Sequence, residues 1–178
     1  MNWKQFNRAN NLLGWAVFVI ATLTYLLTIG PSASLWDCAE FIACDYKLEI
    51  GHPPGAPFYM LVYNVISHLG GGPEHAAVLT NATSAVLSGL TILFLFWTIT
   101  HMVRRVLSPK AHLGEQGLDP VGEVMTRGQG VAILGSGLVG SLVYTFSDSP
   151  WFSAVEAEVY AFSSLFTAVV FWLIFKWE

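Results

Sequence analysis

Two short acidic stretches hold the side chains best suited to chemistry. In the first, Asp37 and Glu40 lie three residues apart, and on a helix that spacing puts both carboxylates on one face. Such a pair could act as a general base toward a hydroxyl or as half of a site for a divalent cation. It also fits a solvated first helical turn in which Asp37 favours the helix dipole, and spacing alone favours this second interpretation.

A histidine follows the first stretch in a stiff turn, His52-Pro53-Pro54-Gly55-Ala56-Pro57. The prolines restrict the backbone and Gly55 permits a sharp bend, so the His52 ring is expected to be held in place. It could bind a lipid phosphate, ligate a metal or share a proton with Asp37. A hydrated turn histidine explains the pattern equally well, and both interpretations remain open at this point.

The second acidic stretch, with Glu156 and Glu158, precedes the last apolar segment and is followed by Tyr160. On a helix, residues two apart point roughly 200° from each other, so at most one of the two carboxylates faces a given site. Glu158 has apolar neighbours, and a carboxylate close to a membrane interior is a functional candidate. We therefore favour a functional Glu158 over a capping Glu156 with a Glu158 that reaches back to the surface.

The composition indicates a membrane protein. Hydrophobic residues make up 54% of the chain and charged residues 11%, and the mean hydropathy is +0.55. Soluble domains carry roughly 25% charged residues. We expect an all-α fold, a polytopic membrane bundle of about four transmembrane helices with a juxtamembrane helix in the first outer loop.

Four apolar segments are expected to cross the ~30 Å hydrocarbon layer. They are residues 12–29, 78–100, 130–146 and 159–175. Residues 58–69 are apolar but too short to span, so they are predicted to form the juxtamembrane helix. A cleaved signal peptide is the less favoured interpretation of the first segment, because its apolar core is long and further spans follow.

The basic residues predict the orientation. With the N-terminus in the cytoplasm, only Lys47 of the eight basic residues lies outside, as the positive-inside rule expects. The outer loops are then residues 30–75 and the short turn 147–157. The cytoplasmic loop 107–128 is glycine-rich, and we expect it to be mobile.

Three smaller patterns are assigned structural explanations. Cys38 and Cys44 are expected to be buried free thiols, because a six-residue offset on a helix points them apart. Small residues four apart in the third span are expected to let helices pack closely. Asn81 fits a glycosylation pattern but begins a spanning helix, so we discount it.

Three motifs together resemble the GT-C membrane glycosyltransferases. They are Trp36-Asp37-Cys38-Ala39-Glu40-Phe41, Gly51-His52-Pro53-Pro54-Gly55-Ala56-Pro57 and Ala157-Glu158-Val159-Tyr160. The chain is most similar to a bacterial protein O-mannosyltransferase-like family long catalogued as a domain of unknown function, over residues 11–178. The mannosyltransferases proper have adjacent Asp and Glu, whereas two residues separate Asp37 from Glu40 here.

The resemblance implies an enzyme that moves a sugar from a polyprenyl-phosphate donor to a hydroxyl of a protein or glycan acceptor outside the cytoplasm. It implies Asp37 and Glu40 as catalytic residues, with Asp37 as base, and substrate contacts from His52, Glu158 and Tyr160. In some relatives a divalent metal is bound by the positions of Asp37 and Glu158. A bacterial inner-membrane location follows, and the chain is expected to be the N-terminal part of a longer protein, because such families have more spans.

Two other functions remain open. The chain could be a non-catalytic membrane subunit that packs in a larger complex through its glycine-rich third span, or, less favoured, an ion-coupled transporter with Glu158 as a relay. Nucleic acid is not an expected partner, because the outer loops are acidic. Membrane lipid is an expected partner in every case.

Overall fold

The computed structural model describes residues 2–107 and 125–177, and within these residues every regular element is helical. The elements are α1 (Trp3–Leu26), α2 (Cys38–Lys47), α3 (Pro57–His68), the 3₁₀ turn η1 (Pro73–His75), α4 (Ala76–Leu107), α5 (Arg127–Thr145), α6 (Asp148–Ala154) and α7 (Val159–Trp177). Most of the expected cytoplasmic loop, residues 108–124, lies outside the described residues. The all-α helical bundle expected from the sequence is confirmed.

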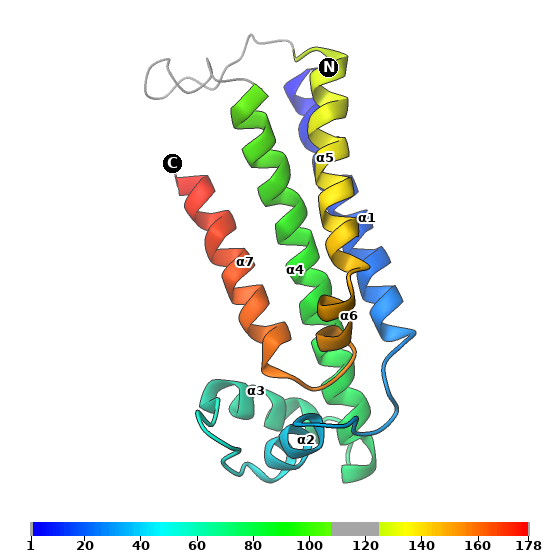
Figure 1. Cartoon of the computed structure of the whole chain (residues 1–178), viewed down its shortest axis with the longest axis vertical. Helices are drawn as coiled ribbons and strands as arrows, with labels where there is room; N and C mark the ends of the chain where they lie inside the picture. The colour runs from blue at the N-terminus through cyan, green and yellow to red at the C-terminus, as the bar shows by residue number, and fades with distance from the viewer. Residues whose placement is uncertain (1, 108–124, 178) are drawn as a thin grey trace.

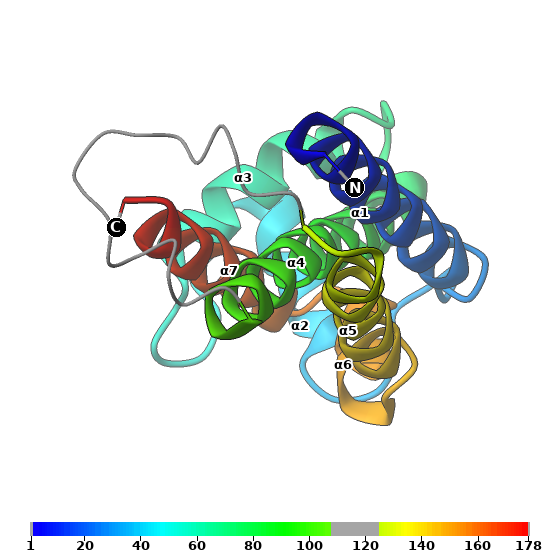
Figure 2. The ribbon, with the colours of Figure 1, turned by 90° about the horizontal axis from the view of Figure 1, so that it is seen from above.

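The long helix α4 is the centre of the bundle. It packs against α1, α5 and α7, and the view along the bundle shows these three helices around it (Figure 2). The short helices α2 and α3 lie together across one end, and the N-terminus lies at the other (Figure 1). The bundle therefore has two different ends. One is covered by the short helices α2 and α3, and the other is formed by the ends of the long helices.

Three helices, α1, α4 with η1, and α7, are long and apolar enough to cross a membrane. The pair α5 and α6 meets the same criteria only when taken together, and it bends by 66° at the break between them. The expected outer turn 147–157 therefore contains a seven-residue helix, α6, which the sequence analysis did not predict. The juxtamembrane helix expected at residues 58–69 is α3.

Local sequence explains where several helices begin and end. Asn2 with Gln5, and Thr126 with Gln129, form capping boxes at the starts of α1 and α5. Pro57 starts α3, where its missing N–H costs nothing. The chain leaves α2 through Leu48 in the left-handed conformation, and this turns it toward the proline-rich loop.

Glycines set the close contacts between the long helices. A Cβ at Gly14 on α1 would lie 2.5 Å from the Trp97 indole nitrogen on α4. A Cβ at Gly137 on α5 would lie 2.5 Å from the Thr100 side chain and 2.8 Å from the Phe96 ring. The small residues of the third predicted span thus allow α5 to pack closely on α4.

Candidate active site

Helix α2 positions the first two acidic residues. Asp37 is its N-cap residue and Glu40 lies in its first turn. The opposite face is apolar: Phe41 and Cys44 pack in one buried cluster with Tyr59, Met60 and Tyr63 of α3. Burial of this face fixes the direction in which the carboxylates point, and both remain partly open to solvent.

His52 lies between the two carboxylates. Its backbone N–H donates to Glu40 Oε1 at 2.6 Å, and its Nδ1 lies 3.1 Å from Glu40 Oε2. Its Nε2 lies 3.9 Å from Asp37 Oδ2. The residue before it is tightly surrounded, because a Cβ at Gly51 would lie 3.3 Å from Glu40 Oε1 and 3.2 Å from Met60 Cε.

This geometry gives Glu40 a different character from Asp37. The hydrogen bond from the His52 backbone, and then the one from its ring, lower the pKa of Glu40 below its usual value. Glu40 is therefore a weak base that holds His52. Asp37 lies 3.9 Å from the imidazole and makes no such bond to it, which leaves its carboxylate free for a substrate.

Asp37, Glu40 and His52 also form the group of described residues most like a metal site. One potential ligand atom from each lies within 4.8 Å of the others. Two carboxylates and an imidazole are ligands that suit a divalent ion such as Mn²⁺ or Zn²⁺. Glu158, the second metal ligand that the resemblance implied, is not a member of this group.

Glu156 and Glu158 lie in the segment that joins α6 to α7, not on a helix. The roughly 200° separation expected of a helix therefore does not apply, and both side chains are buried. Ser34, in the loop before α2, donates a hydrogen bond to the Glu156 carboxylate. The less favoured interpretation, in which Glu156 caps the helix and Glu158 reaches back to the surface, does not fit the structure, because both side chains are buried.

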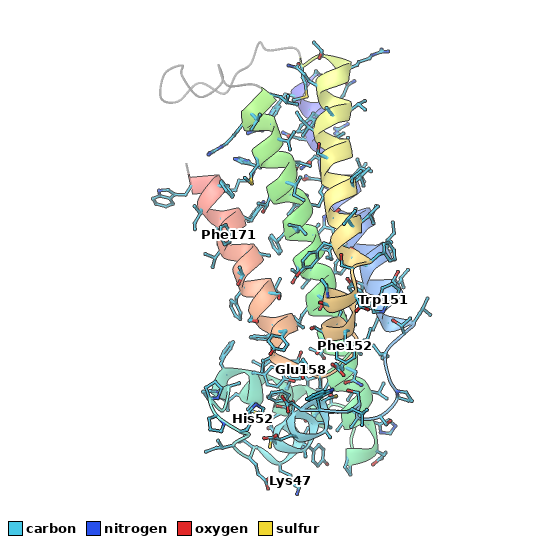
Figure 3. All side chains as sticks on the ribbon, viewed as in Figure 1. Lys47, His52, Trp151, Phe152, Glu158 and Phe171 are labelled. Carbon is cyan, nitrogen blue, oxygen red and sulfur yellow. The ribbon has the colours of Figure 1, made fainter. Side chains whose placement is uncertain are left out.

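Glu158 lies at the start of α7, at the same end of the molecule as His52 (Figure 3). Burial raises the pKa of its carboxyl above the usual value, and the charges of Glu156 and Asp37 raise it further. The backbone N–H of Val159 offsets this in part. The two acidic stretches are thus close enough to interact electrostatically.

Tyr160 points elsewhere. It is exposed and lines a separate pocket of about 220 Å³, with Tyr25 and Tyr144 among its other walls. The expectation of free, buried thiols at Cys38 and Cys44 is confirmed. Asn81 is also buried, and its amide donates to the backbone carbonyls of Gly30 and Ser32, which tethers the start of the first loop to α4.

Asp45 was not predicted as a site residue from the sequence. Its side chain is fully buried, and neither carboxylate oxygen has a hydrogen-bond partner of normal geometry among the described residues. Burial raises its pKa to about 8, and the nearby Tyr59 hydroxyl lowers it only in part. The spacing along α2 could have indicated its burial. Asp45 lies four residues after Phe41 and seven after Cys38, which puts all three side chains on the same, buried face of the helix.

Comparisons with known proteins give a consistent result. Residues 37–178 match the model of the family described as "Protein O-mannosyl-transferase TMEM260 N-terminal domain". A Dictyostelium discoideum protein named protein O-mannosyl-transferase tmem260 is 21% identical over 158 residues, which cover 88% of this chain and 16% of the relative. The Mus musculus protein O-mannosyl-transferase TMEM260 is 24% identical over 166 residues, which cover 92% of this chain and 19% of the relative.

The chain thus spans less than a fifth of the length of these two relatives. No solved structure matches it. These relatives are eukaryotic, so the comparisons support the O-mannosyltransferase likeness and do not support the bacterial family expected from the motifs.

Proposed function

This chain belongs to the family of the protein O-mannosyl-transferase TMEM260 N-terminal domain, and from that premise we propose that it carries catalytic residues of a membrane glycosyltransferase. The proposed reaction moves a sugar from a polyprenyl-phosphate donor to a Ser or Thr hydroxyl of a protein, or to a hydroxyl of a glycan. The observation that supports it most is the cluster of Asp37, Glu40 and His52 on one surface.

In the proposed step, the acceptor oxygen attacks the anomeric carbon of the sugar. The bond from that carbon to the donor's phosphate oxygen breaks, and the polyprenyl phosphate leaves with the electron pair. Asp37 takes the proton from the acceptor hydroxyl. Asp37 is preferred to Glu40 as the base because the hydrogen bonds from His52 lower the pKa of Glu40 and so weaken it as a proton acceptor.

The other residues are assigned binding roles. His52 is held by Glu40 with its Nε2 toward Asp37, where it would contact the donor phosphate. Glu158, with its raised pKa, keeps a proton to a higher pH than an exposed glutamate and would donate a hydrogen bond to the sugar. Tyr160 would contact a more distant part of the acceptor or donor from its own pocket.

A divalent metal fits the same surface. Asp37, Glu40 and His52 would supply its ligands. The resemblance implies Asp37 with Glu158 instead, and Glu158 lies outside this group of three. When bound, the ion would neutralise charge on the donor's phosphate. Chelator treatment followed by metal analysis of the protein tests this assignment independently of activity.

The proposed membrane arrangement follows the charge pattern. The N-terminus lies in the cytoplasm, and the end with α2 and α3 faces the extracytoplasmic side, which is the periplasm for a bacterial inner membrane.

The test uses the intact protein that carries this chain, reconstituted in nanodiscs. A peptide rich in Ser and Thr is incubated with a polyprenyl-phosphate-linked, radiolabelled mannose, and with a nucleotide-linked mannose in a parallel reaction. We expect label on the peptide only with the lipid-linked donor. Label from the nucleotide donor alone would contradict the donor class, and no transfer from a panel of lipid-linked sugars by folded protein would favour the non-catalytic subunit.

A further inference from the structure

A second polar pocket lies at the opposite end of the bundle from the acidic site. It has a volume of about 330 Å³ and is enclosed by α1, the C-terminal part of α4 and the end of α7. Figure 1 shows these helix ends far from α2 and α3, and Figure 2 views the bundle toward them. None of the residues assigned to the proposed reaction lines this pocket.

The pocket has positive charge and no neighbouring acid among the described residues. Arg104 and Lys176 both contribute to its wall. All the acidic residues that the structure describes lie within 37–74 or 148–158, which form the other end of the molecule. From the described residues, an anionic ligand at this end therefore meets attraction without local repulsion.

Each cation is held over an indole ring that lines the same pocket. The Arg104 guanidinium lies 4.7 Å from the ring centre of Trp3, and the Lys176 ammonium lies 5.7 Å from that of Trp172. Contact with an indole face fixes the cation while its N–H groups stay available to an anion. A stacked guanidinium is well suited to bidentate binding of phosphate.

The walls also contain polar groups that lack a partner. The Trp97 indole N–H and the Asn10 amide oxygen are buried without a hydrogen bond among the described residues, and both residues line the pocket. Both atoms are covered by protein, so the donors that a ligand in the pocket can reach are the two cations and the side-chain amides of α1. Asn7 and Asn11 of α1 add further amides to the same wall.

We propose that this pocket binds a phosphate group, carried by the headgroup of an anionic phospholipid or free in solution. The guanidinium and the ammonium are donors matched to phosphate oxygens. Trp3 and Trp172 lie toward the ends of apolar helices, and tryptophans there are typical of the level at which lipid headgroups lie. The site is separate from the proposed transferase centre and does not depend on it.

The experiment measures thermal unfolding of the intact protein that carries this chain, purified in a neutral detergent. Dioleoylphosphatidylglycerol, dioleoylphosphatidylcholine and sodium phosphate are titrated in separate series. We expect phosphatidylglycerol to raise the unfolding midpoint saturably and phosphatidylcholine not to. Arg104→Gln and Lys176→Gln are each expected to weaken the apparent affinity roughly tenfold, as loss of a charged hydrogen bond predicts.

Arg8→Gln is the matched control, because Arg8 is an exposed cation on α1 that does not line the pocket. It should leave the affinity unchanged. Lys176 is also exposed, so Lys176→Gln keeps the test decisive if Arg104→Gln does not fold.

The two sources of phosphate are separated by the third series. Stabilisation by sodium phosphate that is lost in Lys176→Gln identifies a soluble ligand, and stabilisation by phosphatidylglycerol alone identifies a lipid headgroup. Equal effects of the two lipids, equal weakening by Arg8→Gln and Lys176→Gln, or unchanged binding in both pocket variants would overturn the proposal.

Discussion

In the proposed active site, Glu40 holds His52 and is not the base. Its two carboxylate oxygens accept from the backbone and ring of His52, and these bonds lower its pKa. The same contacts place the second ring nitrogen 3.9 Å from Asp37. The role that follows for Glu40 is to position His52 beside Asp37.

Glu40→Gln tests this positioning role. The amide can keep one of the two hydrogen bonds but loses the charge, so His52 should be less well held, and kcat should fall roughly 10- to 100-fold. Thermal unfolding should change little, because the Glu40 side chain is partly open to solvent and not in the core. Glu49→Gln, an exposed carboxylate just after α2, is the matched control and should keep full activity. A Glu40→Gln enzyme as active as that control would contradict the role.

Asp45 makes stability depend on pH. Its pKa is raised by burial from the usual 3.8 to about 8, so the folded state retains a proton that the unfolded chain releases. The free energy of unfolding should therefore fall as the pH rises from about 4 to about 8. Asp45→Asn should remove this fall and raise stability at pH 8 by about 1–3 kcal/mol.

Unfolding midpoints at pH 5 and pH 8 measure this effect, with Glu49→Gln as the control for loss of an exposed carboxylate. An Asp45→Asn protein that loses stability between these pH values as the wild type does would show that Asp45 is charged in the folded state.

At the residue scale, sequence reasoning selected Asp37, Glu40 and His52, which the structure brings together. The burial of Glu156 and Glu158 was not predicted, because a helix was assumed there. In the structure, these two residues lie in a non-helical segment between α6 and α7. Burial of Asp45 was visible as a stripe on α2, but only the facing surface of α3 makes that stripe a core.

At the element scale, glycine spacing decides how closely α5 approaches α4. Gly137 faces Thr100 and Phe96 of α4. Gly135 lies two residues earlier on the same helix, and nothing lies within 4 Å of a Cβ built at that position. Both positions are glycines on α5, but Gly137 is packed against α4 and Gly135 borders open space. Substitutions at the two positions can therefore be compared directly.

Gly137→Ala is expected to destabilise the bundle by about 1–3 kcal/mol, because the new methyl group must displace buried side chains. Gly135→Ala should be neutral or slightly stabilising, since alanine is the better helix former. Thermal unfolding of both variants in detergent measures the difference. Equal effects of the two substitutions would contradict the packing of α5 on α4.

The long apolar helices and the juxtamembrane helix α3 were predictable because their composition and length suffice. Helix α6 was not predicted, since Ser147-Asp148-Ser149-Pro150 is typical of a turn, although Ser147 as N-cap and an early proline also suit a helix start. The 66° bend between α5 and α6 depends on contacts with α4 that the local sequence does not specify.

At the scale of the whole molecule, charge is divided between the two ends. The described acidic residues lie at the end with α2 and α3, where Lys47 is the one described lysine or arginine, and the remaining described lysines and arginines lie on the helix tips at the other end. This division predicts the orientation in the membrane through the positive-inside rule.

Single cysteines at Lys47 and Lys4 test the orientation. Both positions are exposed, and the native cysteines are buried, so background labelling should be low. In intact cells or sealed, outside-out vesicles, a membrane-impermeant maleimide should label Lys47→Cys and not Lys4→Cys. Labelling of Lys4→Cys alone would place the acidic site in the cytoplasm.

Transfer by Asp37→Asn, introduced into the intact protein, tests the central claim most directly. The variant removes the proposed base with almost no change in shape, and Asp148→Asn, an exposed aspartate on α6, is its matched control. We expect Asp37→Asn to fold normally and to lose transfer of lipid-linked sugar by roughly 100-fold or more, with the control unaffected. Folded Asp37→Asn protein that transfers sugar at the wild-type rate would contradict the assignment of Asp37 as the base and, with it, the proposed active site.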